Sequence, residues 1–405
     1  MNKNNKHTLV PKLRFPEFQN EGEWEVKKLG EVLDYERPDK YIVNSENYTD
    51  NGVPVLTANK SFILGYTNEA EGVCENLPAI IFDDFTTDKK FVDFPFKVKS
   101  SAIKILRPKG KNDLKFIFEL MSLIRFEAKE HKRYYISAYQ NLTVQIPNPA
   151  EQQKIAACLS SLDELIEAES QKLELYQQRK KGLLQNLFPR EGETVPKLRF
   201  KDFEESGEWV EKLVGEYFTV GSSKRVLQED WTNHGVPFYR TRELVSLSKN
   251  EPFKSEVFIS EELFSELKER YSIPTEGDFL VSGVGTLGIC YQVQSKDKFY
   301  FKDGNVLWFK LEKGLNSTYF KYCFQSEHIQ NQIIGQTSKS TVGTYTIQNA
   351  KKTKFWYPPT IKEQQKIAAC LSSLDDLINA QTQKIEMLQR HKKGLLQGLF
   401  PPINN

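Results

Sequence analysis

The thirteen-residue stretch EQQKIAACLSSLD occurs twice in this sequence without a single change, as Glu151–Asp163 and as Glu363–Asp375. The two copies lie 212 positions apart, and their likeness continues without gaps to Lys180–Gln185 and Lys392–Gln397. Both copies close with Leu-Phe-Pro. A repeat of this length indicates a duplicated structural unit.

Apolar residues recur in both copies at alternating spacings of four and three. This spacing is typical of a heptad stripe, which keeps one apolar face of an α-helix against a partner helix. The predicted helix-pairing seam consists of Ile155, Leu159, Leu162, Ile166, Leu173, Tyr176, Leu183 and Leu187 in the first copy and of Ile367, Leu371, Leu374, Ile378, Ile385, Leu388, Leu395 and Leu399 in the second. Polar residues interrupt the seam at matching places, namely Glu169, Lys180, Gln381 and Lys392. Such residues commonly fix the register and the number of partners, at some cost in stability.

Prolines precede and follow each predicted helix, where they stop it from extending. The first helix would be about 57 Å long at 1.5 Å per residue. Its simplest partner is the second copy, and two similar helices related by an approximate twofold axis would pair antiparallel. The alternative, in which each helix packs on its own globular domain, stays open.

A second repeat precedes each divergent region. Pro11–Phe15 matches Pro196–Phe200, and a Gly-Glu-Trp triplet follows each, ending at Trp24 and at Trp209. Each half of the chain therefore consists of a leading segment, a divergent region and a long helix. The predicted divisions are 1–147, the first leading segment and domain; 148–189, the first helix; 190–357, the second leading segment and domain; and 358–405, the second helix and tail.

The two divergent regions, about Val32 to Pro147 and about Tyr217 to Tyr357, share little sequence but predict the same order of elements. We expect strands at Val53–Leu56, Ala79–Phe82 and Ala102–Leu106 and a helix at Leu114–Glu130 in the first, and strands at Val236–Tyr239, Phe279–Val281 and Val306–Leu311 and a helix near Thr318–Gln330 in the second. The predicted fold class is α+β, with two globular mixed α/β domains joined by two long antiparallel helices in a coiled coil and related by a pseudo-twofold internal repeat. Matched frames around unlike inserts indicate that the inserts bind different targets.

Composition limits the functional classes. The chain has 405 residues and a formal net charge of only +2, so a surface for nucleic acid must be local. No apolar run approaches the roughly 18 residues that a membrane span needs, and Met1–Lys6 lacks the apolar core of a signal peptide. The five cysteines and five histidines show no metal-ligand spacing. We therefore expect a cytoplasmic protein that binds no metal.

Several catalytic signals are interpreted as structural. Gly283–Gly288 fits the dinucleotide-binding pattern G-x-G-x-x-G, but a β-type run follows it where that motif needs a helix, so we expect a tight strand-to-strand turn. Asp83, Asp84, Asp88 and Lys89 resemble a nuclease cluster but have unspecific spacing, and we expect a solvated turn. The sequence contains no G-x-x-x-x-G-K-[ST] phosphate loop. Tyr357-Pro358-Pro359 has the residue types of an amino-methyltransferase tetrapeptide in the wrong order.

The leading segments with their tryptophans, the two divergent regions and the two nearly identical helices together resemble the specificity subunit of a type I restriction–modification enzyme. The resemblance covers about Pro11 to Pro401, and its most specific part is the duplicated stretch with which the long helices begin.

The resemblance implies two target-recognition domains, each of which reads one half of a split, asymmetric site in double-stranded DNA. It implies that the paired helices act as a spacer and dock two modification (methyltransferase) subunits. Those subunits would carry S-adenosylmethionine and methylate adenine, while separate restriction subunits would translocate and cut DNA with ATP and Mg. This chain itself would be non-catalytic and would bind no cofactor. A rod of about 57 Å could hold two readers one DNA turn, roughly 34 Å, apart.

Base reading requires polar and cationic side chains at groove depth, with further cations on phosphates. In the first region we predict DNA contacts from Thr57, Asn59 and Lys60 after the first strand, from Lys89 and Lys90 in a polar turn, and from Arg133, Tyr134, Tyr135, Ser137, Tyr139 and Gln140. In the second region we predict contacts from Arg240, Thr241, Arg242, Thr286, Ser338, Lys339, Ser340 and Thr341. Arg240 and Arg242 flank a threonine just after a strand, so both can point the same way. The alternative for each residue is an ordinary solvated loop position, and for the tyrosines it is packing.

Two rival functional classes remain at this point. A self-sufficient DNA methyltransferase or nuclease lacks the expected cofactor loop and catalytic tetrapeptide in this sequence. A structural coiled-coil scaffold would explain the helices but would leave two large divergent inserts without a purpose. A scaffold would also show no salt-sensitive affinity for DNA.

Overall fold

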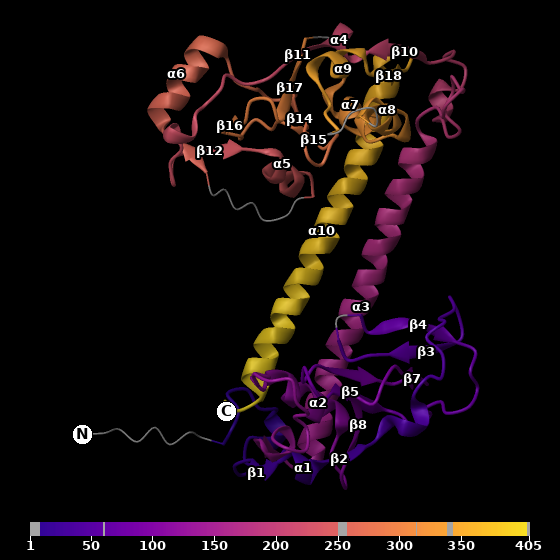
Figure 1. Ribbon diagram of the computed structural model, residues 1–405, viewed down its shortest axis with the longest axis vertical. Helices are drawn as coiled ribbons and strands as arrows, with labels where there is room; N and C mark the ends of the chain where they lie inside the picture. The colour runs from indigo at the N-terminus through magenta and orange to yellow at the C-terminus, as the bar shows by residue number, and fades with distance from the viewer. Residues whose placement is uncertain (1–8, 60, 250–256, 313, 338–342, 403–405) are drawn as a thin grey trace. The chain divides into compact units, whose positions relative to one another are not determined.

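The structure is a computed structural model that describes residues 9–59, 61–249, 257–312, 314–337 and 343–402 (Figure 1). The chain divides into two compact units. The first consists of Met1–Gln171 with Gln383–Asn405, and the second of Lys172–Thr382. Each unit therefore contains one divergent region, the N-terminal part of its own long helix and the C-terminal part of the other long helix.

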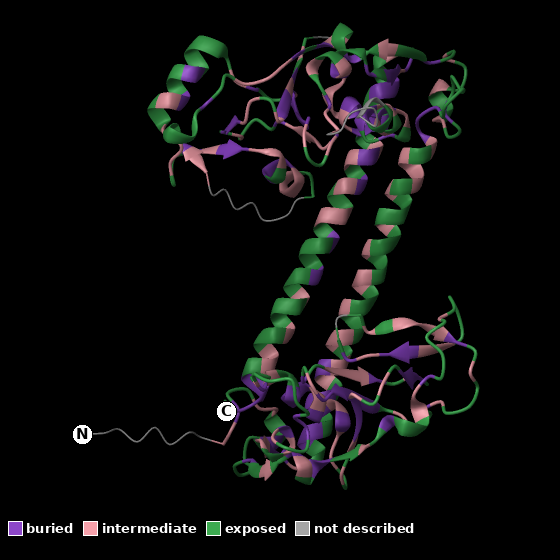
Figure 2. Cartoon of the chain, viewed as in Figure 1, coloured by how far each residue is buried: buried purple, intermediate pink, exposed green. Residues whose placement is uncertain are grey.

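The two predicted long helices are confirmed as α3 (Pro149–Asn186) and α10 (Ile361–Leu399), of 38 and 39 residues. All sixteen seam residues are buried or half-buried. Figure 2 shows buried and half-buried positions alternating with exposed ones along both helices. Their first turns also pack on the globular part of their own unit, through Ile155 and Leu159 in the first and Ile367 and Leu371 in the second. The seam therefore serves a domain core at its start as well as a helical partner.

Ion pairs show how the helices run within each unit. In the first unit Lys392 Nζ lies 2.6 Å from Asp163 Oδ1 and Lys384 Nζ lies 2.5 Å from Glu169 Oε1. Residue numbers fall along α10 as they rise along α3, so the helices are antiparallel as predicted. In the second unit Lys180 Nζ lies 2.6 Å from Asp375 Oδ1, which is the same pair with the helices exchanged. Three of the four polar interruptions in the seam thus make ion pairs between the helices.

The first globular region contains a four-stranded antiparallel sheet, a three-stranded sheet and a two-stranded ribbon. The four-stranded sheet has the order β2 (Leu33–Glu36), β8 (Ile103–Pro108), β5 (Ala79–Asp83), β6 (Lys89–Val92). The three-stranded sheet has the order β4 (Ile63–Thr67), β3 (Val53–Leu56), β7 (Lys97–Val98), with β3 and β7 parallel. The ribbon pairs β1 (Glu25–Lys28) with β9 (Thr143–Ile146), and the helices are α1 (Leu29–Val32) and α2 (Leu114–Leu123). All five residues of β5 are buried, which suits a strand covered on both faces.

The second region repeats this topology strand for strand. Its four-stranded sheet has the order β11 (Phe218–Gly221), β17 (Val306–Leu311), β14 (Phe279–Ser282), β15 (Cys290–Gln292). Its three-stranded sheet has the order β13 (Phe258–Ile259), β12 (Val236–Tyr239), β16 (Tyr300–Phe301), and its ribbon pairs β10 (Val210–Leu213) with β18 (Lys354–Tyr357). The helices are α4 (Val214–Tyr217), α5 (Thr241–Ser248), α6 (Glu261–Tyr271), α7 (Ser317–Phe324), α8 (Glu327–Thr337) and α9 (Ile347–Lys352).

Both predicted domain helices require correction. The helix expected at Leu114–Glu130 ends at Leu123, and Ile124 is already extended. From there the chain leaves the helix axis so that Phe126 packs on Tyr134 and Tyr139, at ring-centroid distances of 5.3 and 5.4 Å. The single helix expected near Thr318–Gln330 is two helices, α7 and α8, because Ser326 Oγ donates to Cys323 O at 2.6 Å and closes the first.

Each leading segment is attached to its long helix by a buried arginine–glutamate pair. Arg14 Nε and Nη2 donate to the two carboxylate oxygens of Glu151 at 2.8 and 2.7 Å. Arg199 makes the same two bonds to Glu363 at 2.7 and 2.9 Å. In the second unit Trp209 Nε1 also donates to Glu363, at 3.2 Å. The repeated PKLRF sequence is therefore explained by one arginine–glutamate contact that is made twice.

We predict that Arg14→Met loosens the first unit specifically. The Glu151 side chain is 1% exposed, so losing its partner leaves a carboxylate buried and unpaired, which costs about 3 kcal/mol. Hydrogen exchange should accelerate about 100-fold at residues 143–156, where the strand and the helix meet. Lys298→Met, which removes an exposed pair with Glu261, is the matched control and should change little. Unchanged exchange in the Arg14 variant would show that the pair is not an anchor.

Candidate nucleic-acid interface

Three segments that are distant in sequence meet in the first unit. They are the turn after β3 (residues 57–59 and 61), the turn between β5 and β6 (residues 83–88) and the segment 130–138. Thr86 Oγ1 donates to Asn59 Oδ1 at 3.1 Å. The Phe85 ring stacks on His131, with 4.7 Å between centroids, and Arg133 Cζ lies 5.7 Å from the Phe85 centroid. Predicted contact residues from the turn after β3 and from the third segment are thus brought onto one edge of the domain, which we call the three-segment edge, and the turn between β5 and β6 contacts both.

Asp84 fastens the third segment to the hairpin. Its carbonyl oxygen accepts from Tyr134 N at 2.8 Å and its Oδ1 accepts from Tyr135 N at 2.7 Å. Lys104 Nζ lies 3.3 Å from Asp84 Oδ2, and both side chains are almost fully buried. Asp83 Oδ1 accepts from the backbone of Phe85 and Thr86, at 2.9 Å each. The prediction of a solvated turn was therefore wrong for these two aspartates, because their carboxylates are inside and organise the backbone.

The equivalent three segments meet in the second unit. Thr241 Oγ1, just after β12, donates to Val284 O at 3.0 Å, in the turn between β14 and β15. Tyr345 N donates to Gly283 O at 2.9 Å, as Tyr134 N does to Asp84 O. A Cβ on Gly283 would lie 2.8 Å from Tyr345 O, so a side chain is excluded at this contact. The two units therefore form the same edge. The first uses the backbone and carboxylate of Asp84, and the second uses only the backbone of Gly283.

The glycine pattern at 283–288 is a hairpin turn, as predicted, since β14 and β15 pair antiparallel on either side of it. Ser282 Oγ donates to Thr286 O at 2.5 Å and accepts from Ile289 N at 2.8 Å, which closes the turn. Gly285 and Gly288 have φ of +80° and +69°, a conformation that glycine adopts without strain. Thr286 is exposed at the tip of this turn.

The Arg240–Arg242 segment is not a loop but the start of α5, with Arg240 at the N-cap. Arg240 and Arg242 do point the same way, because both form ion pairs with Glu243 Oε1, at 2.7 and 2.8 Å. Glu243 was missed from the sequence. The available signal was its position three residues after the N-cap, where an acidic side chain commonly accepts a hydrogen bond from the backbone N–H of the N-cap residue.

The remaining predicted residues fall into distinct environments. Asn59, Arg133 and Ser137 are exposed, while Thr57, Lys89, Lys90 and Gln140 are half-buried. Lys89 Nζ lies 5.9 Å from the Tyr139 ring, and burial lowers the pKa of its ammonium group. Gln140 lies beside Gly30 of α1 rather than on the three-segment edge. Lys60 and the residues Ser338, Lys339, Ser340 and Thr341 lie outside the described part of the chain.

Three of the predicted contact residues are core residues. Tyr134, Tyr135 and Tyr139 are 4%, 1% and 1% exposed. Tyr135 and Tyr139 pack on Phe82, and burial raises the pKa of both hydroxyls well above the ordinary value. A ring enclosed in this way cannot reach a base. The three tyrosines therefore pack in the core, which was the alternative considered for them.

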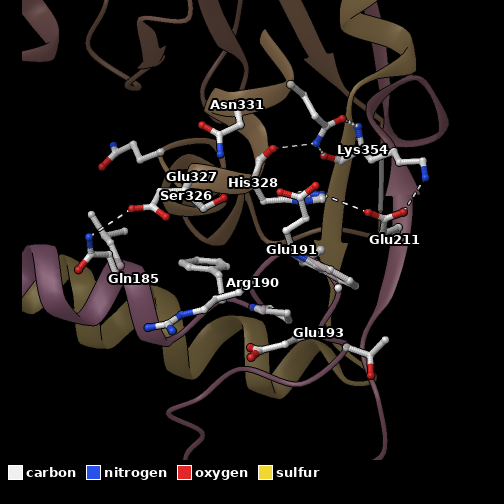
Figure 3. A pocket seen from close by; sticks show the side chains of 18 of the residues that line it. Gln185, Arg190, Glu191, Glu193, Glu211, Ser326, Glu327, His328, Asn331 and Lys354 are labelled. Atoms are coloured by element: carbon white, nitrogen blue, oxygen red, sulfur yellow. Dashed lines mark hydrogen bonds and ion pairs between the residues drawn. The ribbon is translucent and has the colours of Figure 1, made fainter. Parts of the chain in front are cut away.

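A separate hollow of about 1070 Å³ lies in the second unit, between the end of α3, the stretch 189–194 and the start of α8 (Figure 3). His328 lies at its wall, with Nε2 3.3 Å from Glu211 Oε1 and its ring 5.2 Å from that of Trp356. Burial lowers the pKa of His328. Lys354 Nζ pairs with the same glutamate at 2.7 Å. The sequence contained no motif that pointed to this hollow.

Comparison with known proteins identifies the class. The family described as "Type I restriction modification DNA specificity domain" matches residues 21–176 and again residues 206–390. The specificity subunit of the EcoR124I/EcoR124II type I restriction enzyme of Escherichia coli is 31% identical over 401 residues, covering 92% of this chain and 93% of that protein. A putative type I restriction enzyme specificity subunit of Haemophilus influenzae is 25% identical, covering 91% of each chain.

Solved structures agree on the fold. The S subunit of the type I restriction–modification system of M. genitalium matches 98% of this chain with a TM-score of 0.66, at 16% identity and over 100% of its own length. The chain therefore belongs to the family of type I restriction–modification DNA specificity subunits, and it carries two DNA specificity domains. These subunits are non-catalytic, and catalysis lies in partner subunits of the system.

No helix in the described ranges is both long and apolar enough to cross a membrane. Across the same described residues, no group of three or more His, Cys, Asp and Glu side chains could hold a metal ion.

We predict that Asp84→Ala releases the third segment of the first unit. The substitution removes the acceptor for Tyr135 N and leaves Lys104 without its buried partner, and a lost buried hydrogen bond costs about 1–3 kcal/mol. Amide exchange at Tyr134 and Tyr135 should rise about tenfold or more, as measured by mass spectrometry. Asp88→Ala, an exposed position in the same turn, is the control. Equal exchange in the two variants would show that Asp84 does not hold the segment.

Proposed function

We propose that each divergent region reads one half of a bipartite, asymmetric site in double-stranded DNA. The observation that carries the proposal is the three-segment edge, which the same topology forms in both units but lines with unlike side chains. The first edge presents Asn59 and Arg133, whereas the second presents Arg240, Arg242 and Thr286. Equivalent frames with different polar groups are what two readers of different half-sites require.

The residues proposed to face DNA are those of this edge together with other residues predicted from the sequence, among them Gln140, which lies beside α1. They are Thr57, Asn59, Lys60, Lys89, Lys90, Arg133, Ser137 and Gln140 from the first region and Arg240, Thr241, Arg242, Thr286, Ser338, Lys339, Ser340 and Thr341 from the second. The net charge of the chain is only +2, so these local cations would supply the attraction to phosphates. The protein would act in the cytoplasm, on genomic and incoming DNA.

We propose that the long helices hold the two readers apart and dock two modification subunits. Support comes from exposed apolar residues that recur at equivalent positions of both helices, Leu165 with Leu377 and Leu175 with Met387. Surface that is apolar, exposed and duplicated is suited to two copies of one partner. The modification subunits would bring S-adenosylmethionine and methylate adenine, and restriction subunits would use ATP and Mg.

The direct test is base-resolution mapping of methyl-adenine in cells that express this chain with the modification subunits of its own system. We expect one motif with two unlike half-sequences and a gap of constant length. Arg133→Ala should weaken binding of the assembled complex and reduce the slope of log affinity against log salt by about one. The same change should leave the second half-sequence intact. A single continuous motif would contradict the proposed division of labour.

We predict that the gap length follows helix length. One heptad inserted after Gln171 together with one after Thr382 lengthens both helices by about 10.5 Å at 1.5 Å per residue. These are the two positions at which the helices pass from one compact unit to the other. The gap in the methylated motif should grow by about three base pairs, at 3.4 Å each.

Both half-sequences should stay as they were, because neither globular region is altered. The matched control is a heptad of the same sequence inserted into the polar stretch 190–195, which should leave the gap unchanged. If the doubly extended protein methylates sites with the original gap, the helices do not set the spacing.

A further inference from the structure

The carboxylate of Glu243 binds two of the arginines that the second unit presents. Its Oε2 accepts from Arg240 N and Nε at 2.9 and 3.2 Å. Its Oε1 accepts from Arg240 Nη2 and Arg242 Nε at 2.7 and 2.8 Å. Both oxygens are therefore occupied by donors from the two guanidinium groups and from the cap of α5.

Glu243 is built into the domain, while the arginines reach the surface. The Glu243 side chain is 2% exposed, whereas those of Arg240 and Arg242 are 25% and 55% exposed. Burial alone would raise the pKa of Glu243, but hydrogen bonds from both arginines outweigh it and lower the pKa below its ordinary value. The carboxylate thus stays charged, and one negative group is shared by two positive ones.

This contact also fixes which part of Arg240 remains for a ligand. Arg240 turns its Nε–Nη2 edge toward Glu243, and within the described residues Nη1 has no recorded acceptor. The outer edge of the guanidinium, formed by Nη1 and Nη2, is therefore the edge that Glu243 does not engage. A planar outer edge with two donors matches the O6 and N7 acceptors of guanine in the major groove.

The surrounding segments hold the arginines at the three-segment edge. Thr241, between them, donates to Val284 O of the hairpin turn, and a Cβ on Gly285 would lie 3.6 Å from the Thr241 methyl group. The arginine pair is thus tied to the turn that presents Thr286. A long side chain fixed at both its backbone and its Nε–Nη2 edge loses little further rotamer freedom on binding.

We propose that Glu243 is a positioning residue that aims Arg240 at a guanine in the half-site read by the second unit, while the more exposed Arg242 contacts a phosphate. The inference rests on the proposed function and deepens it, since it names a base in one half-site. It requires that this half-sequence contain a G·C pair. It also requires that the identity of that pair depend on a carboxylate that never touches DNA.

The test uses the full chain with the modification subunits of its own system and reads methyl-adenine across the genome. Glu243→Gln leaves the shape of the side chain but removes the charge that orients both arginines. We expect methylation to spread to sites with another base at the one G·C position, with discrimination reduced about tenfold or more. The other half-sequence and the gap should be unchanged, which mere unfolding of the second unit would not produce. Glu261→Gln, which alters an exposed pair with Lys298 in the same unit, is the matched control.

Two further variants separate the roles of the arginines. Arg240→Lys keeps the charge but loses the two-donor edge, so it should relax the same G·C position. Arg242→Gln should weaken binding to all sequences alike and reduce the salt slope by about one. If Glu243→Gln abolishes methylation altogether, Arg240→Lys decides the question.

The outcomes that overturn the inference are specific. They are a second half-sequence made only of A·T pairs, an unchanged motif in Glu243→Gln, or full retention of every G·C position in Arg240→Lys. None of these outcomes affects the proposed function, provided that a bipartite motif is still found. Absence of any bipartite motif in the unaltered protein would instead refute the proposed function itself.

Discussion

The arginine–glutamate pair at the start of each long helix is the contact on which the rest of the structure depends. It joins a leading segment to the first turn of a helix, and the ribbon of β1 with β9, or β10 with β18, continues from that point. Because both carboxylates are 1% exposed, neither partner can be lost without leaving a buried charge. The leading segment and the helix are consequently held together by residues that lie outside the divergent regions.

The same logic explains why the thirteen-residue stretch is identical in both copies. Its first residue accepts the arginine, and its second, Gln152 or Gln364, accepts at 2.9 Å from the N-cap amide of α2 or α7. Its last residue, Asp163 or Asp375, pairs with a lysine of the antiparallel helix. The apolar positions between them enter the domain core. These three polar positions thus make the same contacts in both units, so the two copies have the same requirements.

The divergent regions show the opposite relation between sequence and structure. Their strands follow one topology, yet equivalent places are filled by different chemistry. Asp84 fastens the third segment through a buried carboxylate paired with Lys104, whereas Gly283 does so through backbone in a space too narrow for a side chain. Asn59, in the turn after β3, accepts a hydrogen bond from Thr86. Arg240, after the equivalent strand β12, instead pairs with Glu243 at the start of α5. A frame that tolerates such exchanges can change what it binds without changing how it folds.

What the sequence alone determined was whatever depends on local periodicity or on the repeat. The heptad spacing predicted both long helices, the offset of 212 predicted two equivalent units, and the alternation of apolar residues located β3, β12 and β17 at their observed bounds. The hairpin at 283–288 was also predictable, because a β-type run follows the glycines.

Tertiary structure alone decided which polar residues are inside. Nothing near Asp84 in the sequence indicates Lys104 as its partner. Tyr135 lies in a polar stretch that predicted DNA contacts, although the core encloses it. Burial depends on the other segments that pack against a residue, and those segments come from distant parts of the chain. For the same physical reason the predicted ends of α2 and α7 were wrong. The packing of Phe126 on Tyr134 is a tertiary contact and the hydrogen bond from Ser326 Oγ to Cys323 O is a cap contact, and both override helical propensity.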